Sequence, residues 1–429
     1  MIFLQAQITD TDKMTNLEGR PTKTILNRTV DDKMSASMHF TETSGKNRTL
    51  TALGSIGRLC PPNYKAKRAE SYALRRLAGF QLPNNSVSKC GKYRIKKADI
   101  KVLRSKTNGN SFYANLQQCG LIWVCPVCAK KITEFRKQEV STALQNWQKE
   151  GNTILFLTLT IPHYVNQSCK MVADGFSKIR RRFWNDDRVK QWRKDLGVIG
   201  YITTLESTYG KNGFHVHAHL ALFVEGSTVS SKVVNRAKPV WNRFIQRAGY
   251  KPNKHSWDIQ IADCRIAGYL AKMDISTNWG VAEEMAKSHM KTRLKNGNIS
   301  VWELCRAGGE GDKWASEKWI DYTKGMFRKS FCRFSPGLRA IVLPNDEEEL
   351  TDSEVVKRQD DTAYIVALIP NETWVRIYRC RINAELLDLA DKGSQDGIRE
   401  LLAVYGIPDD LIYPDISGQV GGHGEVARI

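Results

Sequence analysis

The sequence of 429 residues has no apolar run long enough to cross a bilayer. Its longest apolar runs, such as 154–157 and 220–224, are far shorter than the roughly 20 residues that a membrane-spanning helix needs. The N-terminus, MIFLQAQITDTDK, also lacks the basic segment and long apolar stretch of a secretory signal. We therefore expect a cytoplasmic protein without a membrane partner.

Acidic residues are scarce relative to basic ones. Asp and Glu number 45 and Lys and Arg number 65, so the formal net charge is 65 − 45 = +20. A surplus of this size predicts a polyanionic partner. Because no basic amphipathic helix near a lipid anchor is evident, the charge favours nucleic acid over a membrane surface. The alternative is a basic soluble protein without such a partner.

A disulfide framework is not expected among the ten cysteines, because a secretory signal is lacking. Thiols in a reducing compartment are either buried apolar side chains or metal ligands. The sequence Cys125-Pro-Val-Cys128, with Cys119 shortly before it, is typical of a structural zinc site, since two thiolates three residues apart can bind one tetrahedral ion. The fourth ligand is expected to be Cys90, with Cys60 as the second choice.

Composition divides the chain into five predicted segments. Residues 64–106 carry thirteen Lys or Arg against two acids, which suits contacts to phosphates, whereas residues 345–361 hold eight acids. In chain order the segments are a flexible polar arm (1–60), a basic zinc-binding module (61–150), a region of regular strands and helices (151–340), an acidic linker (341–361) and a small C-terminal region of unknown role (362–429).

Hydrophobic patterning in the central region predicts an α+β fold. A short turn at 209–213 joins two strands, which must therefore pair antiparallel. The order β-α-β-β-α-β-α then predicts a ferredoxin-like or RRM-like antiparallel sheet with helices on one face. Further helices are expected in the Trp-rich residues 279–340, and a hairpin is expected over AYIVALI and WVRIYRCRI. The predicted strands are 154–161, 197–208, 214–224 and 256–262, and the predicted helices are 169–194, 228–248 and 263–274.

Three histidines, His215, His217 and His219, alternate along the third predicted strand. Alternate side chains of a strand share one face, so the three imidazoles project together and two neighbouring rings can chelate one ion. Antiparallel pairing across the turn could bring Glu206 beside them as a further ligand. The sequence therefore predicts a divalent metal site. The alternatives are a polar stripe that faces solvent or a purely structural zinc site.

Tyr269 and Lys272 are three residues apart on a predicted helix, which places them on one face. A tyrosine is a weak nucleophile at its ordinary pKa of about 10, but a nearby metal or cation can stabilise the phenolate and the phosphate it attacks. A tyrosine of a short helix is, however, commonly a core residue. Its place after the histidine strand makes Tyr269 a candidate nucleophile.

The segments FLTLT (156–160), FHVHAHLAL (214–222) and YLAK (269–272), in this order, resemble the three motifs of HUH endonucleases. The closest resemblance is to plasmid rolling-circle replication initiators, the Rep proteins, and it covers roughly residues 85–340. It implies an HUH fold for the 151–340 catalytic domain. It also implies a Mg or Mn ion on His217 and His219, with His215 as an additional upstream histidine.

The resemblance further implies that Tyr269 nicks one DNA strand, leaving a 5′-phosphotyrosine and a free 3′-hydroxyl primer. The expected partners are single-stranded or hairpin origin DNA, together with a host helicase and polymerase. One departure concerns Arg265, because related single-tyrosine proteins often carry a Glu at that position for termination. The alternatives are an HUH transposase acting on single strands and a non-catalytic zinc-containing nucleic-acid-binding protein.

Overall fold

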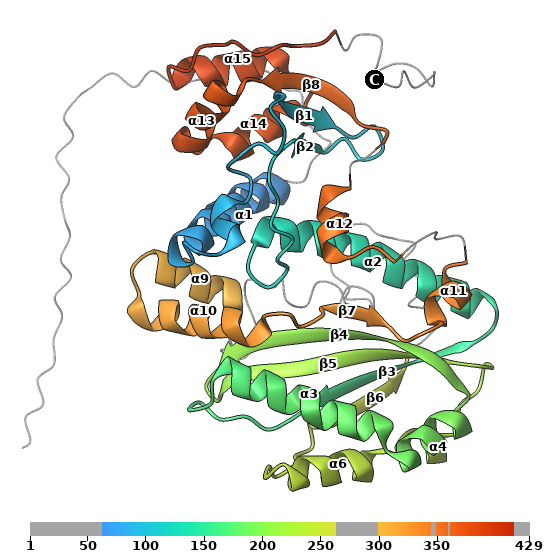
Figure 1. The fold of residues 1–429 in the computed structure, drawn as a ribbon. Coiled ribbons are helices and arrows are strands. Elements are labelled where there is room, and N and C mark those ends of the chain that lie inside the picture. The colour runs from blue at the N-terminus through green and yellow to red at the C-terminus, as the bar shows by residue number, and fades with distance from the viewer. Residues whose placement is uncertain (1–61, 263–298, 345–348, 359–360, 416–429) are drawn as a thin grey trace, which may run out of the picture. The chain divides into compact units, whose positions relative to one another are not determined.

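The structure is a computed structural model that describes residues 62–262, 299–344, 349–358 and 361–415 (Figure 1). All the described residues belong to one compact unit, which lies within Leu59–Ile429. The predicted arm and the predicted helix at 263–274 therefore lie outside the described residues. No helix within the described ranges has the length and apolar character needed to span a bilayer.

The larger sheet contains the four predicted strands and one more. Its order is β6-β3-β5-β4-β7, and every neighbouring pair is antiparallel. The predicted strands thus lie in the spatial order fourth, first, third and second, as in a split βαβ unit. The predicted antiparallel α+β architecture is confirmed. The strands are β3 (Thr153–Thr160), β4 (Val198–Gly210), β5 (Gly213–Val224), β6 (Trp257–Ile261) and β7 (Cys332–Phe334).

Side chains that alternate along β3 point to opposite faces of this sheet. Leu155, Leu157 and Leu159 are buried in the main core, which includes Phe183 and Trp241 from the helices beneath the sheet. The rings of Phe183 and Trp241 meet edge to face with centroids 5.2 Å apart. The helices on this face are α3 (Cys169–Asn185), α4 (Asp187–Asp195) and α6 (Lys238–Arg247), with the short α5 (Ser231–Val234) before α6 (Figure 1).

The predicted single helix at 169–194 is two helices in the structure. The break is at Asp186, whose backbone is extended (φ −69°, ψ 136°) and whose carboxylate accepts a hydrogen bond from the N–H of Arg188. A side chain that caps the first turn in this way starts a new helix. The hydrophobic period spans the break, which is why the sequence pattern does not show it.

In addition to the helices on the predicted face, further helices cover the opposite face of the sheet. The second half of α2 (Pro126–Lys149) and the short α11 (Leu338–Val342) pack on the opposite face. There Trp147 of α2 meets Phe223 of β5 with ring centroids 6.0 Å apart. The opposite face carries large apolar residues at this end, and burying them requires a second cover.

A smaller sheet joins segments that are distant in sequence. Its order is β2-β1-β8, and Ile100 of β1 lies opposite Ile369 of β8. This sheet and three helices share a core of their own. The predicted zinc module and the predicted C-terminal region therefore share one sheet, while the five segment boundaries stay predictions. The elements are β1 (Ile100–Arg104), β2 (Ser111–Ala114), β8 (Tyr364–Ile369), α13 (Asn371–Cys380), α14 (Asn383–Ala390) and α15 (Gln395–Val404).

The predicted hairpin over AYIVALI and WVRIYRCRI is wrong in its second half. The first segment is strand β8, but the second forms helix α13. Trp374 and Ile377 are buried three residues apart, which suits one face of a helix. Packing of this face overrides the strand preference of the valine, isoleucine and aromatic residues.

The Trp-rich region beyond residue 298 forms the predicted helices. Trp302 of α9 and Trp319 of α10 are fully buried, with ring centroids 5.7 Å apart. Helix α10 packs beside α3, and α9 packs beside the N-terminal helix α1. These elements are α9 (Val301–Gly309), α10 (Lys313–Met326), α1 (Pro62–Gln81) and the 3-10 turn η1 (Ser86–Lys89).

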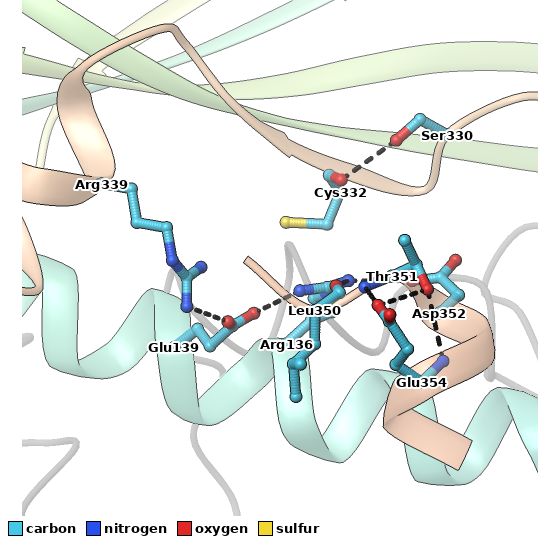
Figure 2. A network of polar contacts seen from close by, with 9 residues as sticks. All are labelled: Arg136, Glu139, Ser330, Cys332, Arg339, Leu350, Thr351, Asp352 and Glu354. Atoms are coloured by element: carbon cyan, nitrogen blue, oxygen red, sulfur yellow. Dashed lines mark hydrogen bonds and ion pairs between the residues drawn. The ribbon is translucent and has the colours of Figure 1, made fainter. Parts of the chain in front are cut away.

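A buried ionic network ties α2 to the chain that follows the larger sheet (Figure 2). Glu139 accepts hydrogen bonds from Arg136 and from Arg339 of α11, both at 2.7 Å. Arg136 also contacts Asp352, the first residue of α12 (Asp352–Lys357), at 3.1 Å. Because an unpaired charge in such a place is costly, the network holds α2 in one position against α11 and α12.

Candidate functional site

Strand β5 places the three histidines on one face of the larger sheet. His215, His217 and His219 alternate with buried apolar residues, as the sequence predicts. Strand pairing puts Glu206 of β4 directly opposite His217. As expected, Glu206 therefore lies beside the histidines in the structure, while the roles of these residues stay predictions.

Glu206 lies between two of the imidazoles. Its Oε2 is 3.1 Å from Nε2 of His217 and 3.7 Å from Nε2 of His219. Glu206 is only 3% exposed and His219 only 6% exposed. Burial by itself raises the pKa of Glu206, but the neighbouring imidazoles of His217 and His219 outweigh it and hold the pKa well below its usual range. The site therefore keeps a buried carboxylate charged, as a cation ligand must be.

Neighbouring residues of β3 fix the ring of His219. The hydroxyl oxygen of Thr158 is 3.0 Å from Nδ1 of His219. The ring of Phe156 stacks on the imidazole, with centroids 5.2 Å apart and planes 11° apart. A hydrogen bond on one ring nitrogen sets which nitrogen is left for a ligand. The Thr158 contact therefore directs Nε2 of His219 toward Glu206.

Glu206, His217 and His219 suit one divalent ion. Their ligand atoms all lie within 4.8 Å of one another. Two ligands at about 2.1 Å from an ion can be at most about 4.2 Å apart, and both carboxylate–imidazole distances are shorter than that. Two imidazoles and one carboxylate match ligands used for manganese or zinc, and the carboxylate also suits magnesium.

His215 has a different neighbour, which the sequence did not suggest. Its Nδ1 is 3.4 Å from Nδ1 of His163, and the two ring centroids are 4.8 Å apart. Burial, followed by the nearby His217 and His163, lowers the pKa of His215 to about 2. Nδ1 of His215 thus faces His163, while the His215 ring also lies 4.7 Å from that of His217 between centroids. His215 is not among the three residues whose ligand atoms group together, Glu206, His217 and His219. The available signal for His163 was its position, two residues after the end of the predicted FLTLTI strand.

Tyr269, Lys272 and Arg265 lie outside the described residues, so their roles stay predictions. The described residues on either side of this segment are both anchored to the larger sheet. Ala262 donates its N–H to the carbonyl of Ile154 at 2.8 Å, and Ile299 forms an isolated bridge with Tyr209 near the histidine end of β5.

Four cysteines meet beside the N-terminal end of α2. Cys90 lies 3.7 Å from Cys125 and 3.6 Å from Cys128, and Cys119 lies 3.7 Å from Cys128, measured between sulfur atoms. Cys90, the first choice for the fourth ligand, is thus brought to the other three. Cys60, the second choice, lies outside the described residues.

This cluster fits a tetrahedral zinc ion. Four sulfurs at 2.3 Å from zinc are about 3.8 Å apart along each tetrahedral edge, close to the separations observed. Such an ion with four thiolates carries a net negative charge. The buried guanidinium of Arg75 lies over the ring of Tyr72 at 4.6 Å, and the charges of Tyr72, Cys90 and Cys125 outweigh burial and raise its pKa. Arg75 therefore offsets charge at the cluster.

Replacing Cys125 or Cys128 with serine should remove bound zinc and lower the melting temperature. A closed thiolate site contributes folding energy but offers no open position to a substrate, so the folded fraction should retain its chemistry. Zinc content by elemental analysis and thermal unfolding measure the two effects. Cys380→Ser, a half-buried cysteine outside the cluster, is the matched control. One equivalent of zinc retained by both cluster variants would show that these thiols are not ligands.

Similarity to known proteins was found over most of the described chain. Residues 111–378 match a family described as "Replication protein". "Protein rep" of Streptomyces lividans is 24% identical over 381 residues, which cover 71% of this chain and 83% of that protein. "Neomycin resistance protein" of Streptomyces cyanogenus is 26% identical over 156 residues, which cover 30% of this chain and 36% of that protein. No solved structure gives a significant match.

Proposed function

Because the chain belongs to the replication protein family, we propose that it initiates rolling-circle replication by nicking one DNA strand at an origin. The family match confirms the resemblance to Rep proteins and favours replication over transposition. The observation that carries the nicking proposal is the group formed by Glu206, His217 and His219, whose ligand atoms all lie within 4.8 Å of one another.

A divalent ion such as Mg or Mn, held by these three side chains, would polarise the scissile phosphate and stabilise its developing charge. Tyr269 attacks the phosphorus, so a bond forms between its phenolic oxygen and phosphorus while the bond from phosphorus to the 3′ oxygen breaks. The products are a 5′-phosphotyrosine and a free 3′-hydroxyl, which can prime synthesis. Lys272 orients the phosphate or the phenolate.

The length of the chain allows Tyr269 to reach this group. Tyr269 is seven residues beyond Ala262. A connection of that length spans about 23 Å when extended and about 10 Å as the predicted helix, to which the tyrosine side chain adds its own length. Ala262 is hydrogen-bonded to Ile154 of β3. Thr158, which lies opposite His219, is four residues further along the same strand. Ile154 and Thr158 are therefore about 13 Å apart. The distance from the last described residue to the metal group is therefore within reach.

Two accessory features belong to the same proposal. Zinc bound by Cys90, Cys119, Cys125 and Cys128 braces the N-terminal end of α2. The surplus of basic residues recognises DNA that is single-stranded or extruded as a hairpin. This chain has Arg265 at the position where related proteins often carry a glutamate for termination. The proposed chemistry is therefore the initiating nick.

The test is incubation of the purified protein with a single-stranded origin oligonucleotide and manganese. We expect a covalent protein–DNA adduct on a denaturing gel, and mass spectrometry should find the DNA on Tyr269. Omitting manganese should prevent the adduct. A protein that binds the oligonucleotide but never forms an adduct would instead be a non-catalytic nucleic-acid-binding protein.

A further inference from the structure

Three adjoining cavities follow α2, and the largest of them reaches Cys90 and Cys128 of the four-cysteine cluster. The largest, about 690 Å³, lies between α1, β2, α2 and the residues after α12. The second and third, about 340 and 330 Å³, adjoin it, and Arg358 lines all three. Among the α2 residues that line them, five are spaced three or four apart and follow one side of the helix, namely Lys131, Phe135, Gln138, Thr142 and Asn146.

The shape of this track suits a polymer better than a small molecule. Asn146 is fifteen residues beyond Lys131 along the helix, which corresponds to about 22 Å along the helix axis. Each cavity by itself has the volume of a small-ligand site, commonly about 300–1,000 Å³, so the feature that suits a polymer is their adjoining order along the helix. A track of this length can accommodate several consecutive units of an extended chain.

The side chains of the track alternate cations with aromatic rings. The ammonium of Lys131 lies 5.8 Å from the ring centre of Phe112. The guanidinium of Arg358 lies 5.7 Å from the ring centre of Phe135. Rings that stack on bases and cations that follow phosphates are how proteins bind single strands without reading their sequence.

Charge in the track favours an anionic occupant. The largest cavity is lined by five cationic and two acidic side chains. Arg68 is paired with Asp388 and Asp391, and Arg75 faces the cysteine cluster. Lys130, Lys131 and Arg358 then remain against Glu134 and Asp361. The third cavity adds Glu139, but Arg136 and Arg339 already neutralise that carboxylate. The positive balance agrees with the net charge of +20 for the whole chain.

From these observations we propose that the track along α2 binds a segment of single-stranded DNA, with bases stacked on Phe112 and Phe135 and phosphates on Lys131 and Arg358. The inference rests on the proposed function for the identity of the strand, which is the DNA that the enzyme nicks. Helix α2 also packs on the histidine-bearing sheet, so one rigid element would connect strand binding with the nicking site.

The test compares two Arg–Phe pairs of the same chain. Phe327 is 61% exposed, lies 5.1 Å from the guanidinium of Arg328, and lines none of the three cavities. Full-length variants are titrated with a fluorescent 12-mer of oligo-dT by anisotropy, without manganese. Phe135→Leu should weaken binding about tenfold, since a stacked base contributes about 1–3 kcal/mol. Arg358→Gln should reduce the slope of log affinity against log salt concentration by about 0.7, the value for one phosphate of a single strand.

Phe327→Leu and Arg328→Gln should bind within twofold of wild type. Unchanged melting temperature and zinc content in Phe135→Leu confirm that its fold is intact. Wild-type affinity and salt dependence in both track variants would overturn the proposal. Competition by dTMP as strong per molecule as that by the 12-mer would also overturn it, because it would indicate a mononucleotide site.

The outcome is separable from that of the nicking proposal. At saturating origin oligonucleotide with manganese, Phe327→Leu should form adduct at the wild-type rate, since Phe327 lines none of the three cavities. If the wild type forms no adduct but the track variants still bind more weakly, the nicking proposal fails while the DNA track stands.

Discussion

Replacing Tyr269 with phenylalanine should abolish the covalent protein–DNA adduct while leaving DNA affinity nearly unchanged. The phenolic oxygen is needed for attack on phosphorus, whereas binding depends on cationic side chains that the substitution does not affect. We expect adduct on a denaturing gel to fall to background. Anisotropy with the same oligonucleotide should change by less than twofold.

The matched control is Tyr250→Phe. The hydroxyl of Tyr250 accepts a hydrogen bond from Gln167 at 3.0 Å, and its ring stacks near Tyr164, so it has a structural environment of its own. This variant should keep adduct formation. Adduct retained by Tyr269→Phe but absent in Tyr250→Phe would mean that the nucleophile has been assigned to the wrong residue.

Replacing His217 or His219 with alanine should lower manganese-dependent cleavage by about a hundredfold or more, whereas His215→Ala should only weaken it. The three rings extend over about 13 Å of strand, so one ion cannot take both outer rings. The structure favours the pair beside Glu206, because His215 is turned to His163. Loss of a catalytic ion removes several kcal/mol of transition-state stabilisation, which corresponds to that factor.

Cleavage rates measured over a manganese titration test this assignment. Glu206→Gln should raise the manganese concentration needed for half-maximal rate, because it removes an anionic ligand. His255→Ala, an exposed histidine outside the group, should behave as wild type. An inactive His215 variant with an active His219 variant would move the metal pair to His215 and His217. Normal cleavage without metal in all three variants would exclude a catalytic role for the cluster.

Local patterns predicted the parts of the fold that depend on neighbouring residues. The four central strands follow from apolar and β-branched runs, and the short turn at 209–213 requires β4 and β5 to be antiparallel. Antiparallel pairing across this turn is also why Glu206 could be expected beside the histidines, and the structure then places it opposite His217. The shared face of the three histidines follows from the two-residue period of a strand.

Other features depended on packing between distant segments. The break at Asp186 and the helix α13 in place of a strand were predicted incorrectly, and the cover of the second sheet face was not assigned to particular helices. Each is decided by which apolar surfaces meet, and a hydrophobic pattern does not specify its partner. Pairing of β1 with β8 is likewise a long-range contact that no local signal announced.

The sequence by itself determined the chemistry available to this protein: alternating histidines, a thiolate pair at zinc spacing, and a large basic surplus. Only the tertiary structure decided how these residues combine. It brought Cys90 to the other three thiols, separated His215 from the Glu206 group through His163, and aligned Phe112, Phe135 and Arg358 along α2. The reason is physical. Residue type and spacing set what a side chain can bind, but convergence in space depends on the burial of apolar surfaces far apart in the chain.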